Sequence, residues 1–219
     1  MAGRDPALAA ALFAALGAEI PCDAARKAEA DALLRTMAGR TAALERVLAL
    51  CAPPESPQEL YLSAKACAWL GSGHRAEAID LAARYLQGPP WAALPDGQAE
   101  QDGIPVDWSS AVRADLLRDM AQSELILGRL SDAYSHSMAA CAMEPYNAMN
   151  FIKASEVVER LSGREEALRF LRGQRKNVWH APVSYRDAAG CPRVNSLFRD
   201  LLDAHIRKLE QAGHAPKNG

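Results

Sequence analysis

Apolar residues recur at three- and four-residue spacing along most of the chain, which is the pattern of amphipathic helices. In 116–127 a single charged residue, Glu124, interrupts the apolar stripe, and a second stripe follows after a short break. Gly128 and Ser131 stand in that break, where a glycine ends one helix and a serine caps the next. Pro145 stops the second helix. The pattern predicts two antiparallel helices joined by a tight turn.

The same spacing occurs elsewhere in the chain and indicates an internal repeat. Four small or helix-breaking residues keep their register across two segments: Ala66, Gly73, Ala78 and Pro90 are spaced as Ala121, Gly128, Ala133 and Pro145 are. A further unit follows Pro145, and a weaker one lies near the N-terminus, where Asp31 stands at a position expected to be small. The predicted repeats are 24–57, 58–90, 114–147 and 148–181.

The segment 114–147 resembles a tetratricopeptide repeat, both in its length of about 34 residues and in the small, turn-forming and helix-ending residues Ala121, Gly128, Ala133, Ala140 and Pro145. It departs from the family pattern at Glu124, where an aromatic residue is usual. The resemblance implies an all-α fold: an α-solenoid of about four helix pairs, forming one domain over 1–219. A helix before the repeats and a capping helix after them would complete it.

Three segments lie outside the repeats. The first, near the N-terminus, contains a short apolar stretch like the core of a signal peptide, but Asp5 and Pro6 favour a helix that packs on its neighbour. An insertion at 91–110 carries a tryptophan at each end, which indicates either anchored ends or a tolerated surface insertion. An irregular link at 177–193 leads to an apolar stripe at about 194–211, predicted to be the capping helix.

Composition narrows the function classes. The chain has 219 residues, of which 49% are hydrophobic but only 6% aromatic, which disfavours a β-sandwich or barrel. A net charge of −2 provides no overall field for nucleic acid or a membrane surface. Five cysteines without a CxxC pair favour reduced thiols in a cytoplasmic protein. We therefore expect neither a nucleic-acid nor a membrane partner.

Candidate chemistry is sparse. The sequence contains no HExxH, phosphate-binding glycine loop or nucleophile elbow. His180 and Cys191 share the link at 177–193, which leaves a small enzyme or metal protein as an alternative. The carboxylates are expected at solvated helix positions. The basic stretch 164–176 is interpreted as a solvated helix face rather than a patch for an acidic partner. The expectation is a protein that is not an enzyme and has no cofactor or metal.

The resemblance implies a different kind of site, because the first helix of each tetratricopeptide unit lines a concave groove that binds peptides. The groove residues expected here are Ser63, Cys67, Arg118, Gln122, Met149, Asn150, Lys153 and Glu156. Their donors suit peptide carbonyls or a carboxylate. The function expected is a non-catalytic adaptor or scaffold for a protein or peptide partner. Alternatives are the substrate-recognition module of a protein-modifying enzyme, such as a glycosyltransferase, and a dedicated chaperone. Self-association is left open.

Overall fold

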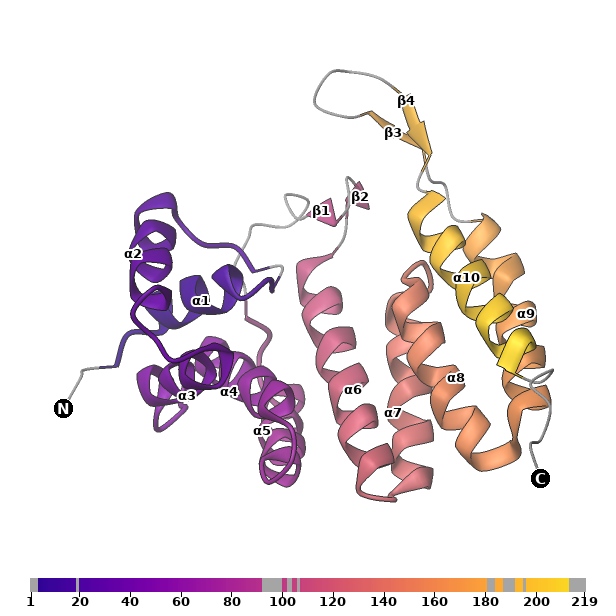
Figure 1. Ribbon diagram of the computed structural model, residues 1–219, viewed down its shortest axis with the longest axis horizontal. Helices are drawn as coiled ribbons and strands as arrows, with labels where there is room; N and C mark the ends of the chain where they lie inside the picture. Colours follow the sequence, from indigo (N-terminus) through magenta and orange to yellow (C-terminus); the bar gives the residue numbers. More distant parts are fainter. Residues whose placement is uncertain are drawn as a thin grey trace. The chain divides into compact units, whose positions relative to one another are not determined.

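The computed structural model describes residues 4–18, 20–91, 100–101, 104–105, 107–180, 184–186, 192–194 and 196–212. These residues are almost entirely α-helical, as predicted (Figure 1). The helices of this part of the chain are α1 (Pro6–Ala15), α2 (Ala24–Leu34), α3 (Arg40–Cys51), α4 (Pro57–Leu70), α5 (Arg75–Gln87), α6 (Trp108–Ile126), α7 (Leu130–Met143), α8 (Ala148–Ser162), α9 (Arg164–His180) and α10 (Ser196–Ala212).

Two short antiparallel strand pairs accompany the helices. β1 (Glu100–Gln101) pairs with β2 (Ile104–Pro105), and β3 (Ser184–Arg186) pairs with β4 (Pro192–Val194). The chain divides into two compact units, Met1–Pro95 and Asp96–Gly219.

Helix α1 forms the centre of the first unit. The side chain of Asp5 accepts a hydrogen bond from the backbone N–H of Leu8, and Pro6 occupies the first turn, where its missing N–H costs nothing. The residues from Leu8 to Phe13 are all buried, and α1 packs against α2, α3 and α4. The predicted N-terminal helix that packs on its neighbours is confirmed.

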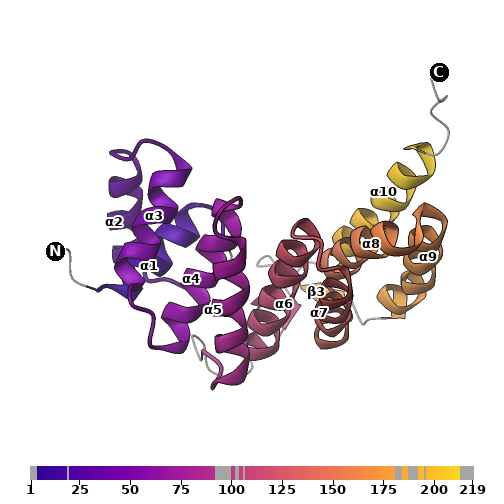
Figure 2. The same cartoon turned by 90° about the horizontal axis from the view of Figure 1, so that it is seen from below.

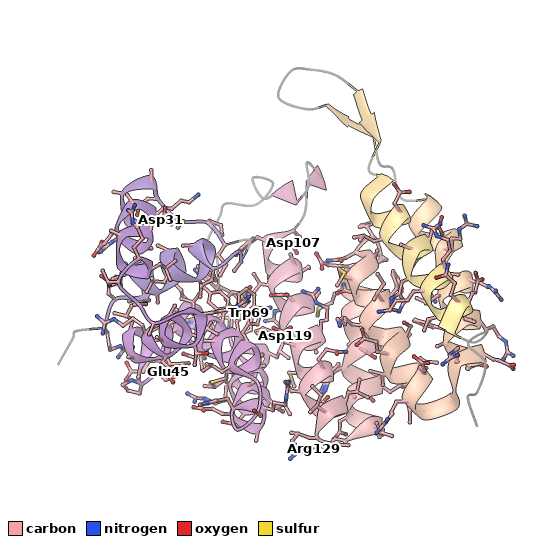
Figure 3. The ribbon with its side chains drawn as sticks, in the orientation of Figure 1. Asp31, Glu45, Trp69, Asp107, Asp119 and Arg129 are labelled. Carbon is pink, nitrogen blue, oxygen red and sulfur yellow. The ribbon has the colours of Figure 1, made fainter. Side chains whose placement is uncertain are left out.

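The segment 24–57 departs from the predicted helix pair. It contains α2 and α3, but α2 packs mainly against α1, whereas α3 packs against α1 and α4. Ala30 is the buried residue of α2, and Asp31 beside it is exposed (Figure 3). The physical reason is that a charged residue at the small position cannot form a close helix–helix contact, so the two helices do not pack as a repeat unit.

Helices α4 and α5 lie side by side, as the repeat 58–90 predicts (Figure 2). Ser56 and Glu59 form a complete capping box at the start of α4. The turn between the helices begins at Gly71, whose φ of 82° lies in the left-handed region that favours glycine. Tyr85, on α5, is 1% exposed, and its hydroxyl accepts a hydrogen bond from the backbone N–H of Trp91.

Successive helices of the second unit pack in a regular order. α6 packs on α7 and α8 packs on α9, and α7 and α8 join the two pairs. α6 also touches α8, and α10 covers both α8 and α9. Ala121 and Ala133 are fully buried between helices, as their size predicts. α6 begins at Trp108 rather than at 114, so the insertion is shorter than predicted.

The C-terminal helix packs over the preceding pair through Leu202, Ile206 and Leu209. Leu201, an apolar residue within the predicted stripe at 194–211, is 37% exposed. α9 continues to His180, so the first part of the link 177–193 is helical rather than irregular. Within the residues that the structure covers, no helix combines the length and the apolarity that crossing a lipid bilayer requires.

Candidate functional site

Arg118 connects the first helices of the two predicted repeats in the second unit. Its Nη1 donates to Oδ1 of Asn150, on α8, at 2.8 Å, and its other terminal nitrogen pairs with Asp115, one turn earlier on α6. The Arg118 and Asp115 side chains are each 20% exposed. The guanidinium is thus held in one orientation by groups from two helices, with part of its surface left to solvent.

Asn150 is a structural residue, contrary to the expectation that it lines a groove. It is 1% exposed, because α8 turns this side chain toward α7. Its Nδ2 donates to the carbonyl oxygen of Ala140 at 3.2 Å and approaches Oε2 of Glu144 at 3.4 Å. Asn150 therefore links α7 to α8 and positions Arg118, and its amide does not face solvent.

Four further predicted residues lie on the partly exposed side of α6 and α8. Nε2 of Gln122 donates to the carbonyl oxygen of Lys153 at 3.4 Å. Nζ of Lys153 donates to Oε1 of Glu156 at 2.9 Å, and these two side chains are 32% and 33% exposed. Met149, in the first turn of α8, is 37% exposed. Arg118, Gln122, Met149, Lys153 and Glu156 together are named the α6–α8 surface below.

Together with the neighbouring Asp115, the α6–α8 surface is balanced in charge. Two cations, Arg118 and Lys153, face two carboxylates, Asp115 and Glu156, each one turn away on the same helix. Such a surface presents hydrogen-bonding groups with no strong net field.

Ser63 and Cys67 do not belong to an exposed surface. They are 3% and 0% exposed, because α4 is packed between α3 and α5. The sequence pattern places them on the first helix of a repeat, but it does not show that this side of α4 is covered. The expectation that they line a groove is corrected by their burial.

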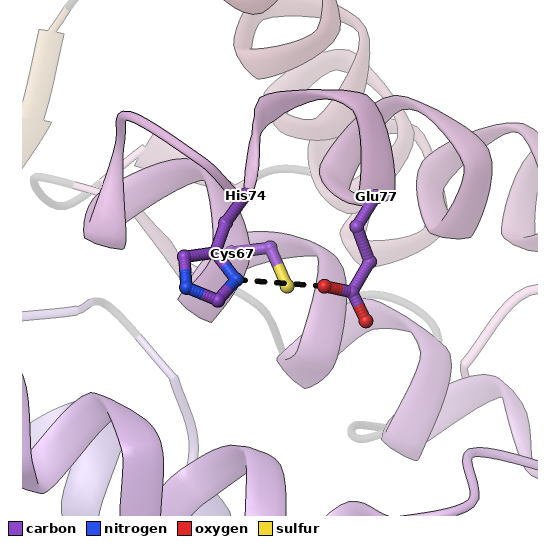
Figure 4. Close-up of side chains that lie close together, drawn as sticks. All are labelled: Cys67, His74 and Glu77. Atoms are coloured by element: carbon purple, nitrogen blue, oxygen red, sulfur yellow. Dashed lines mark hydrogen bonds and ion pairs between the residues drawn. The ribbon is translucent and has the colours of Figure 1, made fainter.

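Cys67 instead lies in a cluster at the α4–α5 turn, with His74 and Glu77 (Figure 4). Nδ1 of His74 is 3.5 Å from Oε2 of Glu77, and one ligand atom of each residue lies within 4.8 Å of the others. Burial, together with the negative charge and the hydrogen bond of Glu77, raises the pKa of the Cys67 thiol to about 12.

Three carboxylates of the described residues are buried, against the expectation that all carboxylates lie at solvated positions. Burial raises the pKa of Glu124 and of Glu144, although hydrogen bonds from His136 and Asn147 oppose the rise. Burial also disfavours the charged form of Glu59, but hydrogen bonds from Arg4 and from the helix N-terminus outweigh it and lower its pKa to about 2.

The basic helix α9 is extensively paired. Arg164, Arg169, Arg172 and Arg175 each form an ion pair with a carboxylate, and the partners are Glu159, Glu166, Glu210 and Asp203. This arrangement fits the interpretation of a solvated, charge-balanced face. Cys191 and the side chain of His180 lie outside the described residues, so the thiol–imidazole alternative stays a prediction.

Sequence reasoning missed Asp115, Glu144 and His74 as members of these clusters. Asp115 and Arg118 are three residues apart on α6, and His74 and Glu77 are three residues apart at the start of α5; this spacing predicts a side-chain contact. The position of Glu144 beside Asn150 depends on the packing of α7 against α8 and carries no such signal.

No family model, no curated protein and no solved structure matches the chain. Any functional conclusion therefore depends on the arrangement of its own side chains.

Proposed function

We propose that the protein is a non-catalytic adaptor of tetratricopeptide type, which binds a segment of a protein partner on the α6–α8 surface. The observation that carries the proposal is the hydrogen bond from Arg118 to Asn150, which joins the first helices of two successive predicted repeats. It fixes a cation at the junction of α6 and α8, beside the amide of Gln122 and the ammonium of Lys153.

The packing order of the second unit supports the finer assignment to a solenoid. α8 contacts both α6 and α10, while α7 contacts α6 and α8, and α9 contacts α8 and α10. In a solenoid the first helices of successive repeats form one continuous surface. The proposal is that this surface runs along α6 and α8.

The proposed ligand is an extended peptide whose carbonyl oxygens accept hydrogen bonds from Arg118, Gln122 and Lys153. Met149, exposed in the first turn of α8, supplies an adaptable apolar contact for a side chain of the peptide.

The experiment compares three folded proteins as bait in source-cell lysate, with mass spectrometry as the readout. They are the wild type, the triple variant Arg118→Ala, Gln122→Ala, Lys153→Ala, and a control triple variant of the same residue types, Arg169→Ala, Gln174→Ala, Lys208→Ala. We expect a partner captured by the wild type and the control but lost from the first variant. Equal capture by all three would place binding elsewhere and overturn the proposal for the α6–α8 surface.

The segment of a captured partner that binds is then located with peptides. Overlapping peptides of its sequence are labelled and titrated by fluorescence anisotropy against the same three proteins. A single peptide that binds the wild type and the control, and binds the first variant at least about tenfold more weakly, is the expected result; each lost hydrogen bond of about 0.5–1.5 kcal/mol contributes to that factor.

A further inference from the structure

The turn between α4 and α5 brings together a thiol, an imidazole and a carboxylate. Cys67 lies in the last turn of α4, His74 is the N-cap of α5, and Glu77 is in the first turn of α5. Gly71 and Gly73, both with positive φ, reverse the chain within four residues. Because the reversal is this tight, the end of one helix faces the start of the next.

The three side chains present one donor atom each toward a common point (Figure 4). Sulfur, imidazole nitrogen and carboxylate oxygen are the ligand set that Zn²⁺ and related divalent ions prefer. The separation of 3.5 Å between Nδ1 of His74 and Oε2 of Glu77 is close to the edge of a tetrahedron with metal–ligand bonds of about 2.1 Å, which is about 3.4 Å. The sulfur lies within 4.8 Å of both, so small side-chain rotations complete the set.

We propose that Cys67, His74 and Glu77 bind a divalent transition-metal ion of the Zn²⁺ class. The ion would enter from solvent, because the His74 and Glu77 side chains are 43% and 59% exposed, while the sulfur forms the buried base of the site. This site lies in the first unit and is independent of the α6–α8 surface.

Binding exchanges one set of contacts for another. In the metal-free chain the sulfur of Cys67 and the imidazole of His74 both lie beside the carboxylate of Glu77. On binding, the sulfur–hydrogen bond breaks, the proton leaves to solvent and a sulfur–metal bond forms. The carboxylate, released from its contacts with Cys67 and His74, becomes a ligand of the ion.

Three protein ligands leave one tetrahedral position on the exposed side, where water or a group from another molecule completes the coordination. The ion joins α4 to α5 at their turn. Since binding requires the folded turn, the ion stabilises the folded state over the unfolded chain.

The test uses full-length protein without a histidine tag, stripped with a chelator and titrated with Co²⁺ and then Zn²⁺. We expect one equivalent of Co²⁺ to produce a thiolate-to-cobalt charge-transfer band that Zn²⁺ abolishes, and Zn²⁺ to raise the melting temperature. Cys67→Ser should remove the band, whereas Cys22→Ser, a control at the half-buried thiol of Cys22, should retain it. No band in the wild type, or an undiminished band in Cys67→Ser, overturns the proposal.

If Cys67→Ser does not fold, variants at the two exposed ligands, His74 and Glu77, still test the proposal. His74→Gln and Glu77→Gln should each weaken Zn²⁺ binding more than about 100-fold, because loss of an outer partner alone costs about 10- to 100-fold. Glu45→Gln makes the same change at an exposed glutamate of the same unit and should leave the affinity unchanged. Equal affinity in the His74→Gln, Glu77→Gln and wild-type proteins overturns the proposal.

Discussion

Nδ1 of His136, on α7, lies 2.8 Å from Oε2 of Glu124, on α6, and the Glu124 side chain is only 3% exposed. This buried polar pair lies between the two helices. The pair satisfies the carboxylate, which would otherwise be costly to bury.

The pH dependence of stability should show the burial of Glu124. Because burial raises its pKa in the folded state above the ordinary value of 4.5, the folded protein binds this proton more tightly than the unfolded chain does. The contribution of Glu124 to stability is therefore greatest below about pH 4.5 and declines as the pH rises through the folded pKa. Urea unfolding from pH 4 to pH 8 should show that Glu124→Gln loses less stability over this range than the wild type.

Glu45→Gln is the matched control for that measurement, because Glu45 is exposed on α3 (Figure 3). Its pH profile should parallel that of the wild type. A Glu124→Gln profile with the wild-type slope would show that Glu124 titrates alike in the folded and unfolded states.

Glu59 should show the opposite pH dependence. Its Oε2 is 2.6 Å from Nη2 of Arg4, and its carboxylate also accepts from the backbone N–H groups of Glu55 and Ser56. With a folded pKa of about 2 against an ordinary 4.5, its contribution is present above about pH 4.5 and lost as the pH falls toward 2. Glu59→Gln should lower the unfolding free energy at pH 7 by about 1–3 kcal/mol.

The pH profile separates this interaction from a general loss of packing. Between pH 7 and pH 3, the difference between Glu59→Gln and the wild type in urea unfolding should shrink. A difference that stays constant over that range would assign the effect to something other than the ionised carboxylate.

Two glycines of the second unit should respond oppositely to alanine. Gly163 ends α8 with a φ of 88°, and Gly173 lies within α9, where an added Cβ meets nothing within 4 Å. Gly163→Ala should destabilise by about 1–2 kcal/mol, because the left-handed conformation strains a residue with a Cβ. Gly173→Ala should stabilise by about 0.5–1 kcal/mol through reduced backbone entropy in the unfolded chain. Thermal or urea unfolding of both variants checks the signs.

Asn150→Ala should destabilise the second unit by about 1–3 kcal/mol, since it leaves the buried carbonyl oxygen of Ala140 without the amide donor of Asn150. Met149→Ala, at the exposed neighbouring position, should change stability by less than about 0.5 kcal/mol. Urea unfolding measures both. A stable Asn150→Ala protein would show that this amide is not the link between α7 and α8.

The helices can be predicted from the sequence, because the residues that define them lie close together along the chain. Ser56 with Glu59, Gly128 and Gly163 mark helix ends through hydrogen bonds and backbone angles within one turn. The small residues Ala121 and Ala133 predict close helix contacts, and both are fully buried. These features need only the chain around them, so periodicity and capping locate them.

The α6–α8 surface can be predicted from the sequence only in part. The spacing of Arg118, Gln122 and Lys153 assigns them to the first helices of repeats, and the structure places all three on the partly exposed side of α6 and α8. Ser63 has the same repeat position but is buried. The position of a residue within the repeat predicts which helix carries it. It does not predict whether another helix covers that side chain.

The sequence by itself determined the helical fold class, most helix boundaries and the close contacts within three of the predicted pairs, because spacing, caps and small residues act over a few residues. Tertiary structure alone decided that α2 packs on α1, that Glu124 is buried against His136, and that Cys67 meets His74 and Glu77 at a turn. These relationships depend on which helix faces cover each other. Helix packing admits several arrangements for the same amphipathic pattern, so only the folded chain selects among them.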